Sequence, residues 1–192
     1  MKQLWTTCVK DLEILRQRVP DSSTDDCEKA IKDIREILAT HDSRNCFGLA
    51  ANQLGMNIRA CLLTVPSHYY DKPQRHSRVT YEFHNPHIIE WGGNVINQEW
   101  CYSLDEQSSY IVQRYKEVTI QDDKNGMTKL FGVPAYAAQH EIDHLNGKVI
   151  CDKGKPAQEI MNIARDKPAN NAPCSCGSGK KFKRCCSKKP AK

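Results

Sequence analysis

Apolar residues recur every three to four positions through much of the first forty residues, which is the spacing of one helix face. Two helices are predicted on this basis, over residues 4–18 and 24–40. The second has a candidate N-cap in Ser23 or Thr24. Its apolar stripe consists of Cys27, Ile31, Ile34 and Leu38.

The pattern then changes to short runs of β-branched and aromatic residues separated by turn residues, which is typical of strands. Gly92-Gly93 and Asn125-Gly126 are predicted turns. A last helix of about 12 residues begins near Val133-Pro134 and stops at Gly147. This order predicts an α+β fold with antiparallel sheets packed around the last helix. The predicted strands cover residues 59–65, 79–83, 87–90, 110–112 and 117–121.

Length and charge divide the chain into a main domain and a tail. At 192 residues it has room for one domain with a proper core and a short appendage. Residues 167–192 contain eight basic and no acidic residues, which leaves a formal charge of −3 on residues 1–166. We expect a catalytic domain over 1–166, a polar, proline-containing linker over 167–172 and a tail over 173–189. The charge of the tail favours an anionic partner.

The sequence predicts a cytoplasmic protein. Lys10, Asp11 and Glu13 interrupt the stretch where a signal peptide would be apolar, and no segment has the length of a membrane span. Thiols stay reduced in the cytoplasm. Half of the ten cysteines are therefore expected to be buried structural residues, namely Cys8, Cys27, Cys46, Cys61 and Cys151.

The segment 139–147 points to metal chemistry. His140 and His144 are four residues apart on the predicted last helix, so both imidazoles can reach one metal ion. Glu141 lies about 100° around the helix from His140, where a carboxylate can contact metal-bound water without filling a coordination position. This layout indicates metal-assisted hydrolysis. A solvent-facing helix turn with two incidental histidines is the alternative.

Two upstream segments offer further site residues. Cys101 is the best candidate for a third ligand, because a thiolate with two neutral imidazoles leaves one position for water. In residues 47–53, Gly48 permits close backbone approach to a ligand, and the Gln53 amide can donate to a developing oxyanion. The alternatives are a buried structural cysteine and a helix that packs through small residues.

These three segments, in this order, resemble the peptide deformylase family. Residues 139–147 match its Gln-His-Glu-apolar-Asp-His-Leu-x-Gly segment completely. Its Gly-apolar-Gly-apolar-Ala-Ala-x-Gln segment is matched from Gly48 through Gln53, with Cys46 in place of the first glycine. The resemblance extends over about residues 45–152. The family's Glu-Gly-Cys-Leu-Ser segment is matched at Glu99, Cys101 and Ser103, with Trp100 and Tyr102 at the other two positions.

The resemblance implies a hydrolase that removes the N-formyl group from the formylmethionine of nascent polypeptides. By position it makes Cys101, His140 and His144 the metal ligands. It makes Glu141 the general base that later protonates the leaving amine. Family members mostly use Fe²⁺, although this ligand set also suits Zn²⁺, Ni²⁺ or Co²⁺.

The resemblance also implies contacts to the substrate. Gln53 and the backbone N–H of Tyr102 would hold the oxyanion. Trp100 and Tyr102 are bulkier than the family's glycine and leucine, so they either reshape the cleft or point away from it. For Arg114 a surface ion pair is the alternative. The expected substrate-side residues are Phe47, Gly48, Leu49 and Arg114.

The end of the chain resembles the SEC-C motif, a short zinc-binding tail. Four thiolates with a glycine-containing turn between the pairs suit a closed tetrahedral zinc site, and so short a segment would fold only with metal. A disordered basic tail is the alternative. Lysines and an arginine in the tail make the ribosome, through rRNA or protein, the expected partner. The expected zinc ligands are Cys174, Cys176, Cys185 and Cys186.

Two other functions stay open at this point. A different metal-dependent amidase or protease would use the same helix motif but would leave the Cys101 and Gln53 segments unexplained. A deformylase-like protein without activity would act as a module that binds the ribosome, nucleic acid or protein. Retention of Glu141 and of all three candidate ligands argues against the second possibility.

Overall fold

The computed structural model describes residues 7–40, 46–69, 78–105, 108–159, 171–173 and 178–185. Helices α2 to α5 are Leu12–Leu15, Thr24–Thr40, Val133–Leu145 and Ile150–Lys153. The short 3-10 helices η1 to η3 are Ala51–Leu54, Ser67–Tyr69 and Phe182–Arg184. Strands β1 to β7 are Gly48–Ala50, Ala60–Pro66, Arg78–His84, His87–Glu99, Tyr110–Asp122, Gly126–Phe131 and Lys155–Pro156.

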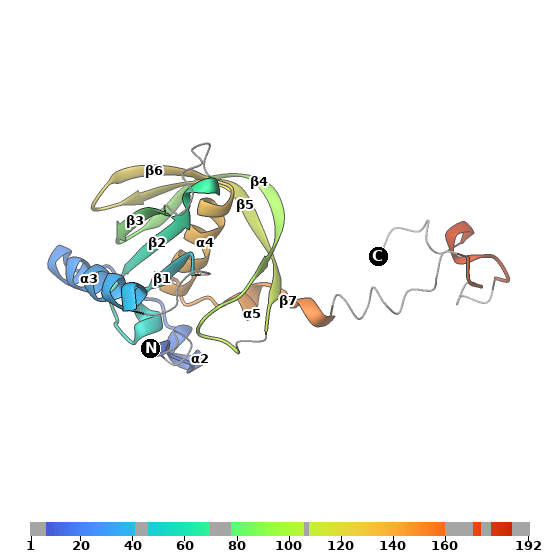
Figure 1. Cartoon of the computed structure of the whole chain (residues 1–192), viewed down its shortest axis with the longest axis horizontal. Coiled ribbons are helices and arrows are strands. Elements are labelled where there is room, and N and C mark those ends of the chain that lie inside the picture. Colours follow the sequence, from blue (N-terminus) through green and yellow to red (C-terminus); the bar gives the residue numbers. More distant parts are fainter. Residues whose placement is uncertain are drawn as a thin grey trace.

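The strands form two antiparallel sheets around α4. One sheet has the order β1-β2-β3, and the other has the order β4-β5-β6, with β7 paired to the start of β5. Helix α4 packs against strands of both sheets, and α3 packs against β2 and β3 (Figure 1). The predicted α+β fold is therefore confirmed, with α4 as its central helix.

Two apolar clusters explain this arrangement. The larger joins both sheets to α4, with Phe83, Ile120 and Ile142 among its fully or almost fully buried members. The smaller lies under α3, where Ile31 and Ile34 pack with residues of β2 and η1. Burial of apolar side chains is the main stabilising contribution in such a domain. The predicted apolar stripe of residues 24–40 is confirmed as the face by which α3 is attached.

The N-terminal helix differs from the one predicted over residues 4–18. Residues 1–6 lie outside the described part, and α2 covers only Leu12–Leu15. The Asp11 side chain accepts a hydrogen bond from the Glu13 N–H at 2.9 Å, which makes Asp11 the N-cap. An N-cap residue has non-helical backbone angles, so α2 begins only after it.

Strand β4 runs through Gly92 and Gly93, so the turn predicted there is wrong. Gly92 lies opposite Glu117 of β5, and a Cβ atom at Gly92 would lie 2.6 Å from Glu117 Oε1. Gly93 has a φ of +61°, which favours glycine. The glycine pair therefore lies within a paired strand and not in a turn between strands. The turn at Asn125-Gly126 is confirmed, and it leads into β6, which the sequence pattern did not predict.

Of the five cysteines expected to be buried, four are confirmed as buried. Cys8, Cys27, Cys46 and Cys61 are buried, Cys151 is half-buried, and none of them forms a disulfide within the described residues. Among the described residues, no helix is both long enough and apolar enough to cross a membrane.

Candidate metal centre

Helix α4 presents the two motif histidines from a firmly packed position. Its N-terminus follows Gly132, and Pro134 lies in its first turn, where a proline needs no backbone partner. Buried Ala135, Ala138 and Ile142 attach its apolar face to the larger cluster. The rings of His140 and His144 then lie together, with centroids 5.0 Å apart.

Cys101 reaches the same point from the end of β4. Its sulfur lies 3.2 Å from His144 Nε2, and the candidate ligand atoms of Cys101, His140 and His144 all lie within 4.8 Å of one another. Cys101 and His144 are each 1% exposed. A converging set of one thiolate and two imidazoles fits a divalent transition metal. The structure thus brings the three predicted ligands together.

The electrostatics of this cluster favour the ligand form of the cysteine. Burial opposes ionisation of the Cys101 thiol, but His144 and His140 outweigh burial and hold its pKa well below the usual value. Burial likewise disfavours a charged His140, yet its contacts with Cys101 and Glu99 raise its pKa well above the usual value. A thiolate is the species that binds metal, and an ion bound here would replace the proton on His140.

Glu141 stands beside the cluster without a hydrogen-bond partner for one of its oxygens. The residue is 4% exposed, and its Oε2 is buried and unsatisfied among the described residues. Burial raises the pKa of its carboxyl above the usual value. Gly48 of β1 makes room for it, because a Cβ atom there would lie 2.8 Å from Glu141 Cγ and Oε1. An unsatisfied buried carboxylate oxygen suits a group that binds a water or a substrate.

Gln53 of η1 lies on the Cys101 side of the cluster. Its Oε1 accepts from the Ala50 N–H at 2.9 Å, which fixes the orientation of the amide. The Nε2 group then points to Ser103 Oγ at 3.3 Å and to Cys101 Sγ at 3.7 Å. The neighbouring Asn52 donates to the His144 carbonyl oxygen at 2.8 Å. The segment 47–53 is therefore part of the same site as the helix motif.

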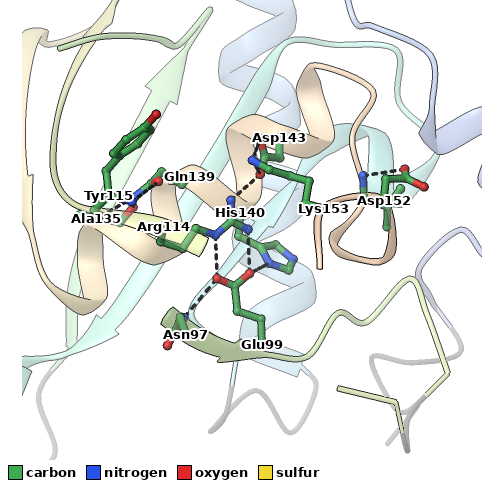
Figure 2. A network of polar contacts seen from close by, with 11 residues as sticks. Asn97, Glu99, Arg114, Tyr115, Ala135, Gln139, His140, Asp143, Asp152 and Lys153 are labelled. Carbon is green, nitrogen blue, oxygen red and sulfur yellow. Dashed lines mark hydrogen bonds and ion pairs between the residues drawn. The ribbon is translucent and has the colours of Figure 1, made fainter. Parts of the chain in front are cut away.

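A buried ion-pair network contacts His140 at its Nδ1 atom (Figure 2). His140 Nδ1 lies 3.0 Å from Glu99 Oε2, and the Arg114 guanidinium donates to both Glu99 oxygens at 2.7 Å. Arg114 also binds Asp143, which accepts from Lys153 Nζ. Burial would raise the pKa of Glu99, but hydrogen bonds from Arg114 and His140 hold it well below its usual range. The network fixes the ring orientation of His140.

Gln139 joins α4 to β5 next to this network. Its side-chain amide accepts from the Tyr115 N–H and donates to the Tyr115 carbonyl oxygen, each at 2.9 Å (Figure 2). A third contact runs to the Ala135 carbonyl oxygen within α4. Like Glu99 and Asp143, Gln139 belongs to a segment noted in the sequence, but no role was predicted for any of them. Their side-chain partners are distant in sequence, so spacing alone does not reveal them.

The placement of Arg114 does not support the expected contact with substrate. Its side chain is 0% exposed, and its guanidinium is engaged by Glu99 and Asp143. The alternative, an ion pair at the protein surface, does not fit this buried Arg114 side chain either. Strand alternation is the signal that could have found this position, because Arg114 shares a strand face with buried Val112. Arg114 instead contacts Glu99, which in turn contacts His140, one of the candidate metal ligands.

The remaining expected residues lie around the cluster in different ways. Phe47 is half-buried and packs edge-on against Tyr69, with the ring centroids 5.8 Å apart. The Leu49 side chain is fully buried, so only the backbone of Leu49 is available to a ligand. Trp100 is 54% exposed. The half-buried Tyr102 side chain packs on the cluster under α3. The bulky Trp100 and Tyr102 are thus accommodated without entering the larger core.

The tail is described only in part. Pro173 forms an antiparallel bridge with Lys181, and Ser178 Oγ lies 3.2 Å from Cys185 Sγ. Cys174, Cys176 and Cys186, the other three expected zinc ligands, lie outside the described residues.

The chain is similar to known proteins along both segments. The sequence profile of the polypeptide deformylase family matches residues 6–159, and the profile of the SEC-C motif matches residues 171–188. The peptide deformylase of Syntrophobacter fumaroxidans is 33% identical over 153 residues, which cover 78% of this chain and 85% of that protein.

Solved structures show the same likeness. The crystal structure of a probable peptide deformylase from synechococcus phage S-SSM7 has a TM-score of 0.60 and 28% identity, and the match covers 73% of this chain and 93% of that one. A peptide deformylase of Acinetobacter baumannii in complex with Met-Ala-Ser has a TM-score of 0.60 and 23% identity, with coverage of 76% and 96%.

Proposed function

Because the chain belongs to the polypeptide deformylase family, we propose that it removes the N-formyl group from formylmethionine at the start of nascent polypeptides. The observation that carries this proposal is the cluster of Cys101, His140 and His144 with an unsatisfied carboxylate oxygen of Glu141 beside it. The relative in complex with Met-Ala-Ser supports a peptide that begins with methionine. We place the reaction in the cytoplasm, where new chains emerge.

Cys101, His140 and His144 would hold the catalytic metal. When bound there, a divalent ion acidifies water and polarises a carbonyl group. We propose Fe²⁺, as the family resemblance implies, with Zn²⁺, Ni²⁺ and Co²⁺ as ions that the same donors accept. The Glu99 carboxylate keeps His140 oriented for this purpose, and the Asn52 side chain of η1 donates to the His144 carbonyl oxygen of α4.

The chain's own groups supply the proton transfer and the oxyanion contacts. Glu141 takes a proton from the attacking water and returns it to the leaving methionine amine. Its raised pKa suits both directions of this transfer. The Nε2 group of Gln53 and the backbone N–H of Tyr102 donate to the oxygen of the formyl carbonyl as negative charge develops on it. The products are formate and a peptide with a free amino terminus.

The peptide itself would lie along β1. This strand pairs with β2 on one edge and ends the order of its sheet, so its outer edge can donate and accept backbone hydrogen bonds. Gly48 lies on this strand, next to the Glu141 side chain. Half-buried Phe47 supplies an apolar contact for the first side chain.

The tail would bind zinc and the ribosome. We propose that Cys174, Cys176, Cys185 and Cys186 hold one Zn²⁺ ion in the segment 173–189, after a catalytic domain over 1–166 and a linker over 167–172. The match to the SEC-C motif supports this. Lys180, Lys181 and Lys183 lie in a stretch without acidic residues, which suits contacts with rRNA or an acidic ribosomal protein.

The test compares two acyl groups on one peptide. Anaerobically purified protein loaded with Fe²⁺ is given N-formyl-Met-Ala-Ser and N-acetyl-Met-Ala-Ser, and release of the free amine is measured. We expect kcat/KM for the formyl peptide to be higher by at least roughly 10²-fold, because the acetyl methyl group crowds the attacked carbon. Similar rates would indicate a broader amidase. No hydrolysis of either peptide by metal-loaded protein would indicate a binding module instead.

A further inference from the structure

The segment just before α2 touches two separate parts of the metal site. The Val9 N–H donates to the Gln53 carbonyl oxygen at 2.7 Å. Lys10 Nζ donates to the Tyr102 carbonyl oxygen at 2.5 Å and to the Leu104 carbonyl oxygen at 3.0 Å. Two adjacent residues at the start of the chain thus contact both η1 and the turn that follows β4.

That turn contains the third candidate ligand. The Leu104 N–H donates to the Cys101 carbonyl oxygen at 3.0 Å, so residues 101–104 form a β-turn. Its central peptide group joins Tyr102 to Ser103. Type I and type II turns differ by a flip of this central peptide, and the backbone angles of both central residues change with it. The direction of the Tyr102 carbonyl therefore reports which turn is formed.

The Lys10 ammonium group donates a hydrogen bond to this carbonyl oxygen. A flip of the central peptide would remove the carbonyl from Lys10 and would move Ser103, whose Oγ accepts from Gln53 Nε2 at 3.3 Å. The same Nε2 lies 3.7 Å from Cys101 Sγ. An ammonium group has three donors, so one lysine can bind the Tyr102 and Leu104 carbonyls together. The contact therefore opposes a rearrangement of the residues next to the cysteine ligand.

The backbone of Lys10 is held by contacts on both sides of the residue. On one side, Val9 is bound to Gln53, and Cys8 is buried in the cluster under α3. On the other side, Asp11 caps α2, whose Leu15 is fully buried. The segment is further attached by an ion pair between Arg16 and Asp152 at 2.6 Å. The lysine thus extends from a fixed piece of chain.

We propose that Lys10 is a positioning residue of the metal site. It holds the Cys101–Leu104 turn in one conformation, and so sets the positions of the Cys101 sulfur and of the Ser103 hydroxyl that accepts from Gln53. The effect on catalysis rests on the proposed function, whereas the effect on the metal site does not. No covalent step involves Lys10.

The test uses the full-length chain with one neutral and one charge-conserving replacement. Lys10→Met removes the ammonium at similar length, and Lys10→Arg keeps a donor for both carbonyls. Lys29→Met, at an exposed lysine on α3, is the matched control. Three measurements are made: the absorption spectrum of the Co²⁺-loaded protein, the rate of metal loss to a chelator, and kcat and KM for a formyl peptide.

For Lys10→Met we expect an altered Co²⁺–thiolate absorption band and metal loss that is faster by roughly three- to tenfold, the size of one typical hydrogen bond. We expect kcat to fall by roughly the same factor with KM changed less than about twofold, because orientation and not peptide binding is affected. Lys10→Arg should restore most of each value, and Lys29→Met should match the unaltered protein.

An unchanged spectrum and unchanged metal loss in folded Lys10→Met would overturn the proposal. So would equal effects in Lys29→Met, or no recovery in Lys10→Arg. If Lys10→Met does not fold, as judged by circular dichroism, the same measurements on Lys10→Gln decide. If the unaltered protein hydrolyses no formyl peptide, the proposed function fails, but the spectrum and the chelator rate still test the role of Lys10.

Discussion

The position of Glu141 shows how a single residue is prepared for a chemical role. It follows a candidate metal ligand on α4, is almost fully buried, and has one oxygen without a hydrogen-bond partner among the described residues. The missing Cβ of Gly48 leaves space for its side chain. Such an arrangement costs stability, because burial of an unsatisfied carboxylate is unfavourable. A buried, unsatisfied carboxylate is typical of sites where the group acts on a water or a substrate.

Replacement of Glu141 tests this role directly. In Glu141→Gln we expect kcat for a formyl peptide to fall by roughly 10²- to 10⁴-fold, the usual loss for a positioned acid or base. The metal content should stay at the level of the unaltered protein, because Cys101, His140 and His144 remain. Metal analysis and turnover are measured on the same preparation, and Glu117→Gln, on the partly exposed side of β5, is the control. Near-normal kcat in the metal-loaded variant would contradict the assignment.

At the scale of elements, the site depends on how β4, β5 and α4 are joined. Arg114 of β5 binds Glu99 at the end of β4 and Asp143 of α4, and Gln139 binds the backbone of β5. Attraction to these carboxylates raises the pKa of Arg114 despite its burial, so the guanidinium stays charged. A charge in this position needs its partners, since an uncompensated buried ion is strongly unfavourable.

Removal of this arginine should therefore be costly. In Arg114→Met we expect the free energy of unfolding to fall by about 3–5 kcal/mol, because Glu99 and Asp143 lose their buried partner. In Lys153→Met, which removes a more exposed partner of Asp143, the loss should be about 1 kcal/mol or less. Urea unfolding of both variants measures the difference. Equal, small losses in the two variants would show that Arg114 is not essential to the packing of α4 on β5.

At the scale of the whole molecule, two segments of opposite charge are joined in one chain. Residues 1–166 carry a formal charge of −3, whereas the stretch from 167 to the end contains only basic charges. Attraction to a polyanion is thus concentrated in the tail, and the catalytic cluster lies entirely in the first segment. Catalysis and docking are then expected to separate when the chain is cut between them.

A chain that ends at Ala172 tests this separation. We expect it to keep full activity on short formyl peptides and to lose co-sedimentation with ribosomes. Binding of the complete protein should weaken steeply as salt rises, because contacts with phosphates release counterions. Equal ribosome binding by both chains would falsify the docking role. Binding by the complete chain that persists at high salt would favour an apolar protein contact over rRNA.

The sequence alone determined the features that depend on local spacing. The stripe from Cys27 to Leu38 predicted α3, because residues three and four apart share a helix face. The same rule placed His140 and His144 together on α4. The match of three short segments then identified the family, and the order of the predicted helices and strands indicated the α+β fold. In each case the relevant neighbours lie within one element or one motif, so the order of residues contains the information.

Only the tertiary structure decided how distant segments meet. Arg114 was expected near substrate, but the pairing of β5 with β4 places it against Glu99. Gly92 and Gly93 were predicted to form a turn, and only the pairing of β4 with β5 shows that they continue a strand. The contact of Lys10 with the Tyr102 carbonyl joins residues 92 positions apart. Such contacts arise from packing of complete elements, and no local pattern of residue types specifies them.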